Sequence, residues 1–258
     1  MAYHSNILFL TEIVPLNTTR IDKFIAAHLN ISRRDVRLIL AQKRVVVDSR
    51  VATNIDQRIN KFSTVILDGD VILDNQPVYI MLHKPVGVVS ATSDKQHKTV
   101  IDLIDCNNIE HLQSKDELHI AGRLDLNSSG LILLTNDSRW SEAIASPEGK
   151  VEKCYQVTLE NKLTHEYIEA FKQGFYFGYE DITTLPAKLT IINAHFAEVK
   201  LIEGKYHQIK RMFGRFRNPV VALHRSAIGS ITLDENLAAG KYRALTAEEI
   251  KLPKPHTD

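Results

Sequence analysis

The excess of strand-like runs over helix-like runs after residue 77 limits the fold of this chain more than any other feature of its sequence. Runs rich in β-branched and aromatic residues are typical of strands, whereas helix-like spacing is confined to two segments. Successive parallel strands would need crossover helices between them. We therefore expect an α+β domain at 76–250, with a mixed, largely antiparallel β-sheet and flanking helices, rather than a doubly wound fold. The strand-like runs are 78–92, 153–160, 187–204 and 218–233, and the helix-like ones are 164–174 and 206–216.

A smaller module precedes this domain at 18–75. Apolar residues recur at helical spacing over 20–29, and Ser32 has the position of the N-cap of a second helix over 33–43. The β-rich runs that follow are separated by Asp-Ser and Asp-Gly turn signals. We expect two short helices and a small curled sheet, joined to the next domain by a short linker. The buried side of the second helix would carry Val36, Ile39 and Leu40. We interpret residues 1–17 as an extension and 251–258 as a loose tail.

Basic residues gather in two segments of a chain whose net charge is only +1. Segment 33–44 has five basic residues and one acidic residue, and segment 205–225 has six basic residues and no acidic one. Arg33, Arg37 and Arg44 are spaced by four and seven, which places them on one helix face and its exit. Such surfaces favour phosphate binding at defined places, although an ordinary solvated helix face has the same pattern. The basic residues of the second segment are Lys205, Lys210, Arg211, Arg215, Arg217 and Arg225.

Composition argues against several classes of protein. Cys106 and Cys154 stand far apart without CxxC spacing, so we expect neither disulfides nor a metal site, and a cytoplasmic location. No apolar run reaches the roughly 20 residues that cross a bilayer, so we expect no membrane partner. The apolar patch near the N-terminus contains Glu12 and lacks a basic flank, which argues against a secretory signal. Without a Gly-rich phosphate loop we expect no nucleotide cofactor.

The stretch AGRLDLNSSGLILLTND, at 121–137, contains the most informative candidate residue. Asn127, Ser128 and Gly130 are turn-forming residues ahead of an apolar strand, and Gly130 can adopt an unusual φ there. From these residues alone, Asp125 could serve the turn or carry out chemistry.

Two segments of the carboxyl half hold possible companions for Asp125. Tyr155 stands at the start of a strand, where core packing is the commoner role for a tyrosine. Lys210 and Arg211 lie in a helix-like segment just before apolar residues. A cation at such a boundary can be held near a carboxylate in a partly dry site, while a phosphate-binding or solvated pair is an equal alternative.

The module at 18–75 resembles an S4 (αL-type) RNA-binding domain. The residues that carry the resemblance are RIDKFIA, ISRRDVRLILAQKRVVVDSRVATNIDQRI and DGDVI. In that family the Ser-Arg-Arg helix lies along the RNA backbone, which suits phosphate contacts by arginine. The RNA-binding residues that the resemblance implies are Arg20, Arg33, Arg34, Arg37 and Arg44.

The remainder of the chain resembles the pseudouridine synthases, in the branch that modifies ribosomal RNA and has an S4 domain ahead of its catalytic domain. Four motifs in order carry this resemblance, and together they are far more specific than any one of them. The fold implied is an elongated mixed sheet with flanking helices, divided by a catalytic cleft. Ser128 stands where threonine is commoner, and Ser138 replaces a small glycine. The motifs are MLHKPVGVVS, GRLDLNSSGLILLTND, EKCYQVTL and EGKYHQIKRMF.

The resemblance implies roles for individual residues. Asp125 would be the essential catalytic aspartate, acting at C1′ or C2′ of the ribose, and Tyr155 the active-site tyrosine. Lys210 would be the cation that pairs with Asp125, with Arg211, one position later, as the alternative. RNA contacts would come from Arg123, Lys205, Arg211 and Arg215, with Arg217 and Arg225 in the same cluster.

The function implied is isomerisation of a specific uridine to pseudouridine in ribosomal RNA. The residues of these motifs are most similar to those of the branch that acts on small-subunit (16S) rRNA, and 23S rRNA is the alternative target. A rival from another class is a non-catalytic S4-type RNA-binding or ribosome-associated protein. The expected partner is rRNA or an assembling small-subunit particle, bound by a monomer that uses no cofactor and no metal.

Overall fold

The computed structural model describes residues 18–251. The chain divides into two compact units, Met1–Pro77 and Val78–Asp258. The expected N-terminal extension, and all but the first residue of the expected tail, lie outside the described residues.

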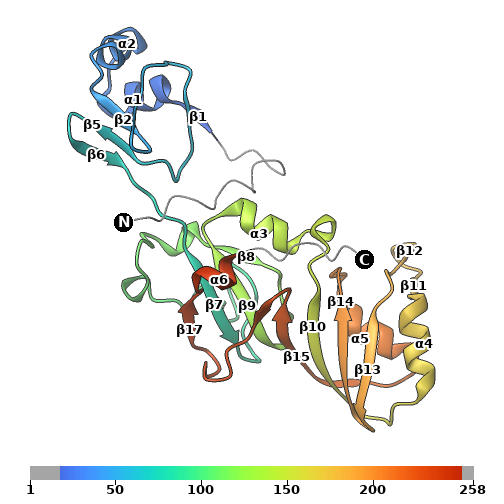
Figure 1. Cartoon of the computed structure of the whole chain (residues 1–258). Coiled ribbons are helices and arrows are strands. Elements are labelled where there is room, and N and C mark those ends of the chain that lie inside the picture. The colour runs from blue at the N-terminus through green and yellow to red at the C-terminus, as the bar shows by residue number, and fades with distance from the viewer. Residues whose placement is uncertain (1–17, 252–258) are drawn as a thin grey trace. The chain divides into compact units, whose positions relative to one another are not determined.

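The first unit contains the two short helices α1 (Ile21–Leu29) and α2 (Arg33–Ala41) (Figure 1). Its strands form two small antiparallel sheets. The helices pack on a four-stranded sheet of order β3-β2-β5-β6. The two-stranded sheet pairs β1 with β4. The strands are β1 (Thr19–Arg20), β2 (Val45–Val47), β3 (Arg50–Val51), β4 (Arg58–Ile59), β5 (Val65–Leu67) and β6 (Asp70–Leu73).

Local signals set the boundary between the two helices. Helix α1 ends at Asn30, whose left-handed φ of 53° turns the chain. The Ser32 side chain then accepts a hydrogen bond from the Asp35 amide and caps α2. Val36, Ile39 and Leu40 are buried, and each contributes roughly 1.5–3 kcal/mol by leaving water. The predicted cap and the predicted buried side of α2 are both confirmed.

The second unit contains a nine-stranded mixed sheet whose main path is β13-β14-β10-β15-β9-β7-β17. Strand β8 also pairs with β9, and β16 with β15. Neighbours are antiparallel except β9 and β15, which run parallel. The predicted α+β class with a largely antiparallel sheet is confirmed. The strands are β7 (Tyr79–Lys84), β8 (His119–Ala121), β9 (Ser129–Thr135), β10 (Lys153–Leu159), β13 (Lys188–Asn193), β14 (Phe196–Leu201), β15 (Val220–Ile228), β16 (Ile231–Thr232) and β17 (Tyr242–Ala244).

Each face of this sheet has its own hydrophobic core. Helices α4 (His165–Gln173) and α5 (Gln208–Gly214) pack on one face beside the segment 88–118. Helix α3 (Ser138–Ala145) covers the other face through Trp140 and Ile144 (Figure 1). Short elements complete the unit: the hairpin of β11 (Tyr176–Phe177) and β12 (Ile182–Thr183), the 3-10 turns Cys106–Asn108, Lys115–Glu117 and Pro147–Gly149, and helix α6 (Ala247–Ile250).

The sequence-based prediction did not include the short elements β8, β17, α6 and the β11–β12 hairpin, and it differs from the structure at two further places in this unit. Residues 88–92 were expected to form a strand, but only Val89 pairs, in a single bridge with Thr99. The Ser90 hydroxyl instead donates to the carbonyl of Leu124 and accepts from its amide. This segment therefore contacts the loop between β8 and β9 and does not form a strand. Helix α3 was not predicted, because an eight-residue helix with two buried apolar side chains gives a weak periodic signal.

No helix among residues 18–251 has the length and apolar character needed to cross a membrane.

Candidate active site

Asp125 lies in the loop that joins β8 to β9, at the centre of the large sheet. The Ser128 amide donates to the Asp125 carbonyl at 3.0 Å and closes a turn. Gly130 follows with φ of +113°, and a Cβ atom there would overlap backbone atoms of Arg225. Glycine therefore lets β9 and β15 pair in parallel at this point. The unusual φ predicted for Gly130 is confirmed.

Two buried cations hold this loop by its backbone carbonyls. Lys84, 0% exposed, donates to Ser128 at 2.7 Å and to Pro85 at 3.1 Å. Arg225, 2% exposed, donates to the carbonyls of Gly122 at 2.7 Å and Leu131 at 2.9 Å. Buried carbonyls need such partners. The turn that the sequence suggested is therefore fixed from two neighbouring strands.

Burial lowers the pKa of Lys84 to about 8. The negative charge of Asp125 opposes this shift, and the positive charges of Arg225 and Lys210 add to it. Lys153, on β10, is a second buried lysine, and its pKa is lowered to about 8 by burial and by Arg225. Lys84 therefore interacts with the single carboxylate of the loop and with two further cations, Arg225 and Lys210.

The Asp125 carboxylate faces two basic side chains from the segment that begins α5. Lys210 Nζ lies 3.3 Å from Asp125 Oδ2, and His207 Nε2 lies 3.4 Å from the same oxygen. Arg211 points elsewhere, because it donates two hydrogen bonds to Glu180 at 2.7 and 2.6 Å. Between the two cations that the sequence left open, Lys210 is the one beside Asp125.

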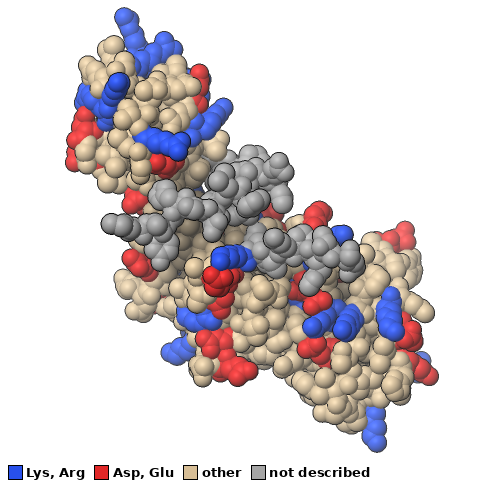
Figure 2. Space-filling model, in the orientation of Figure 1, with Lys and Arg blue, Asp and Glu red and all other residues tan. Residues whose placement is uncertain are grey.

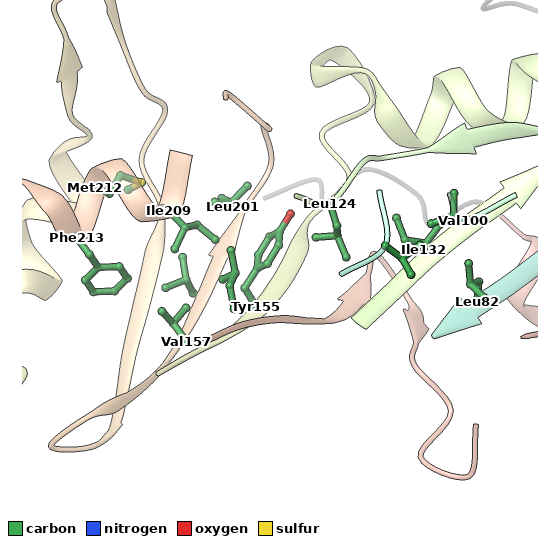
Figure 3. Packing of buried hydrophobic residues seen from close by; sticks show 14 of the residues in the cluster. Leu82, Val100, Leu124, Ile132, Tyr155, Val157, Leu201, Ile209, Met212 and Phe213 are labelled. Atoms are coloured by element: carbon green, nitrogen blue, oxygen red, sulfur yellow. The ribbon is translucent and has the colours of Figure 1, made fainter. Parts of the chain in front are cut away.

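Tyr155 approaches the same place from β10, where it is paired in register with Arg225. The ring is buried among apolar side chains that include Leu124, Leu201 and Ile209 (Figure 3). Its hydroxyl lies 3.5 Å from an Arg225 nitrogen. Residues Tyr155 and Asp125, distant in the sequence, thus line one cavity of about 90 Å³ that opens to solvent.

The cavity lining combines one acidic side chain with several basic ones. Asp125 is its only carboxylate, and Ser128 adds a buried hydroxyl that has no hydrogen-bond partner within residues 18–251. Arg123 is exposed and makes no ion pair in the described part of the chain. The basic lining residues are Arg123, Lys205, His207 and Lys210, and the others are Leu124, Tyr155, Leu201, Gly204, Gln208, Ile209 and Leu223.

Other members of the predicted basic cluster lie outside this cavity. Arg215 is exposed and donates to the Tyr176 carbonyl at 2.5 Å, and Arg217 is exposed in the turn after α5. The expectation that Arg225 contacts phosphate is wrong, because its buried guanidinium bonds the loop backbone.

Three residues of this region were not singled out from the sequence as site residues. Nothing in the sequence marked His207 except its position in a motif. Nothing marked Lys153 except its position two residues before Tyr155. For Lys84 a signal existed: it continues the alternation of buried Ile80 and Leu82 along β7, so its ammonium had to enter the interior.

The basic face of the first unit is divided between paired and unpaired arginines. Arg20 and Arg33 both bond Asp22, which is 1% exposed, and Arg44 pairs with Asp68. The hydrogen bond from Arg20 contributes most to lowering the pKa of Asp22 to about 2, and the bond from Arg33 adds to it. Arg34 and Arg37 are exposed and form no ion pair with any described residue. Basic side chains project from the visible surface of this unit (Figure 2).

Across the described residues, no three His, Cys, Asp or Glu side chains gather as a metal site would require.

Comparison with known proteins assigns the class. Residues 78–214, which include Asp125, Tyr155 and Lys210, match the family of RNA pseudouridylate synthases. The chain belongs to this family, and the resemblance predicted from the four motifs is confirmed.

Two relatives and one solved structure are similar over most of the chain. Ribosomal small subunit pseudouridine synthase A of Pseudomonas aeruginosa is 45% identical over 232 residues, which cover 90% of this chain and 98% of that protein. The protein of the same name from Escherichia coli K12 is 42% identical with the same coverage. A crystal structure of a pseudouridylate synthase superimposes with a TM-score of 0.64 at 35% identity, covering 90% of this chain and 98% of the other.

Proposed function

We propose that this protein isomerises one uridine of small-subunit ribosomal RNA to pseudouridine, with Asp125 as its catalytic carboxylate. The observation that carries the proposal is the position of Asp125: it is the only carboxylate that residues 18–251 contribute to its cavity, and it lies 3.3 Å from Lys210 and 3.4 Å from His207. Similarity at 45% identity to a small-subunit enzyme supports the choice of substrate.

The reaction breaks the bond between ribose C1′ and uracil N1, turns the uracil and joins its C5 to C1′. The hydrogen on C5 is lost and N1 gains one, so the composition of the nucleotide is unchanged. Asp125 acts at C1′ as a nucleophile or at C2′ as a base. Lys210 orients the carboxylate and balances its charge, because an ion pair at 3.3 Å restricts both side chains.

The remaining site residues serve to hold the nucleotide. A base inside folded RNA must leave its stack before chemistry, at a cost of a few kcal/mol. Tyr155 offers an aromatic surface in the cavity, and Arg123 and Lys205 offer charge to phosphate at its mouth. Arg211, within α5, and Arg215, at the end of that helix, are proposed as further phosphate contacts.

The first unit is proposed to be an S4-type RNA-binding domain. Arg34 and Arg37 are the best candidates for phosphate contact, because they are exposed and form no ion pair within residues 18–251. Arg20, Arg33 and Arg44 keep part of their side chains exposed beside their acidic partners. Since the proposed substrate is rRNA or an assembling small-subunit particle, we place the action of the protein, as a monomer, in the cytoplasm.

Two measurements test this proposal. Pseudouridines are mapped in 16S and 23S rRNA from cells with and without the protein, and we expect one 16S position to lose its modification. Loss at a 23S position instead would show that 23S rRNA is the substrate. No change in either rRNA would contradict the enzyme assignment.

The purified variant Asp125→Asn tests the residue. We expect it to lose isomerisation and to retain RNA affinity within a few-fold, whereas Asp116→Asn, an exposed aspartate outside the cavity, keeps full activity. Full activity of Asp125→Asn would exclude the proposed catalytic role and favour a non-catalytic RNA-binding protein.

A further inference from the structure

An exposed aromatic ring stands beside the cavity without a role in the proposed reaction. Tyr206 is 71% exposed, although burial of a tyrosine ring is strongly favourable. Its ring stacks on His207, with 3.9 Å between centroids and 20° between planes. His207 in turn contacts Asp125 and lines the cavity, while Tyr206 does not line it. The Tyr206 ring therefore lies just outside the chemical site, one residue from it.

The backbone that carries this ring pair is held firmly. His207 has a left-handed φ of 48°, and Arg211 donates to the Tyr206 carbonyl at 3.3 Å. On the other side, the Lys205 amide donates to the Gln208 side chain at 2.9 Å, and the buried Gln208 amide donates to buried Glu203 at 2.6 Å. A ring fixed in this way loses little conformational freedom when a ligand stacks on it.

The charges around the ring suit a polyanion. Lys205 precedes Tyr206, and Lys210 and Arg123 line the adjoining cavity. The acidic groups of this region are already engaged: Asp125 lies beside Lys210 and His207. Glu203 is buried and bonded to Gln208 and the Leu185 amide, and Glu180 is paired with Arg211. Exposed aromatic rings among basic groups are the usual means by which proteins hold unpaired nucleotides.

We propose that Tyr206, supported by His207, stacks on an unpaired base that neighbours the uridine placed in the cavity. The inference rests on the proposed function, since it assumes that the uridine reaches Asp125. The stacked base is a neighbour rather than the target because the ring lies outside the cavity lining. Tyr206 is thus a positioning residue, which holds the strand after one nucleotide has left its stack.

The first test compares ring removal with ring retention in the full chain. With transcribed rRNA that wild-type protein isomerises, Tyr206→Ala should raise KM or lower the single-turnover rate about tenfold or more. Tyr206→Phe and Tyr206→Trp should remain within about twofold, because stacking needs only the ring. Tyr179→Ala removes a tyrosine that is 98% exposed and outside the cavity lining, and it should behave as wild type. Wild-type kinetics for Tyr206→Ala, or a failure of Tyr206→Phe to retain activity, would overturn the inference.

The second test identifies the stacked nucleotide. Once the target uridine is mapped, short RNAs that carry an abasic residue on either side of it are compared on wild type and on Tyr206→Ala. At one flanking position, the abasic residue should weaken binding to wild type and leave binding to Tyr206→Ala unchanged, as expected for a shared contact. Equal weakening of both proteins at every position would contradict the inference.

Failure of the proposed function gives a different result. If wild-type protein isomerises no uridine in either rRNA, the function is wrong before Tyr206 is tested. If it isomerises normally and the ring has no effect, only the stacking role is wrong.

Discussion

The ammonium of Lys84 donates a 2.7 Å hydrogen bond to the carbonyl of Ser128, so the last residue of β7 fixes the end of the loop that carries Asp125. Arg225 holds the beginning of the same loop at Gly122. The position of the carboxylate therefore depends on two cations that do not line the cavity.

Lys84→Met tests this support. The variant leaves the Ser128 and Pro85 carbonyls without their partner, which costs about 1–3 kcal/mol of unfolding free energy. It also removes the burial penalty that lowers the pKa of Lys84, which offsets part of this loss. Displacement of Asp125 should also lower kcat roughly tenfold to a hundredfold with little change in RNA affinity. Denaturant unfolding and single-turnover kinetics measure the two effects. The exposed Lys95→Met is the control, and equal kcat values for the two variants would refute the positioning role.

Gly130→Ala tests the parallel pairing of β9 and β15. An added methyl would overlap the Arg225 backbone, at a φ of +113° that alanine rarely adopts. Because backbone atoms of a central strand cannot move aside, we expect a loss of about 3 kcal/mol or more in unfolding free energy. Gly214→Ala is a matched control, since no atom lies within 4 Å of its added methyl. Similar stability of the two variants would contradict this account.

Lys153→Met tests the pH dependence of stability. Because the pKa of Lys153 falls from 10.5 in the unfolded chain to about 8 in the folded one, its burial opposes folding below pH 8. That penalty disappears as the pH rises from 8 to 10.5, where the unfolded chain also loses the proton. Lys153→Met should therefore be more stable than wild type at pH 7, by up to about 3 kcal/mol.

The difference between Lys153→Met and wild type should shrink toward zero near pH 10.5, as measured by denaturant unfolding across this range. Lys162→Met, at an exposed position, should differ from wild type by no more than about 0.5 kcal/mol. A difference that stays constant with pH would show that Lys153 is not a buried cation.

Arg37→Glu tests RNA capture by the first unit. Arg37 is exposed and has no ion pair within the described residues, so reversal should weaken rRNA binding and flatten its salt dependence. Thermal unfolding should be unchanged. Arg33→Glu is expected to differ, because Arg33 bonds the buried Asp22 at 2.7 Å, and reversal would destabilise the unit. Unchanged affinity of Arg37→Glu at moderate salt would argue against an RNA-binding role for this face.

Local patterns in the sequence predicted much of the fold, and motifs predicted that Asp125, Tyr155 and Lys210 belong to one site. The Ser32 cap, both helices of the first unit and the strand of Tyr155 follow from nearest neighbours and periodicity. Helix α3 did not, since Trp140 and Ile144 are the only apolar residues on its buried side, where they flank the polar Ser141.

What the sequence could not supply is the set of contacts between distant segments. Arg225 was grouped with phosphate-binding residues because its neighbours in the sequence are basic. Its true partners are the carbonyls of Gly122 and Leu131, and backbone acceptors carry no sequence signature. In the same way, the ion pair of Arg211 with Glu180 separates it from Lys210, although the two are adjacent.

The parallel pairing of β9 with β15 also determines when during synthesis the site can exist. A nascent chain that ends after α5 already contains Asp125, Tyr155 and Lys210, but it lacks β15 and therefore Arg225. Non-local strand pairing forms late, after the chain between the partners is complete. A chain interrupted before residue 220 thus contains every cavity residue except Leu223 and still leaves the Asp125 loop without one of its two holding cations.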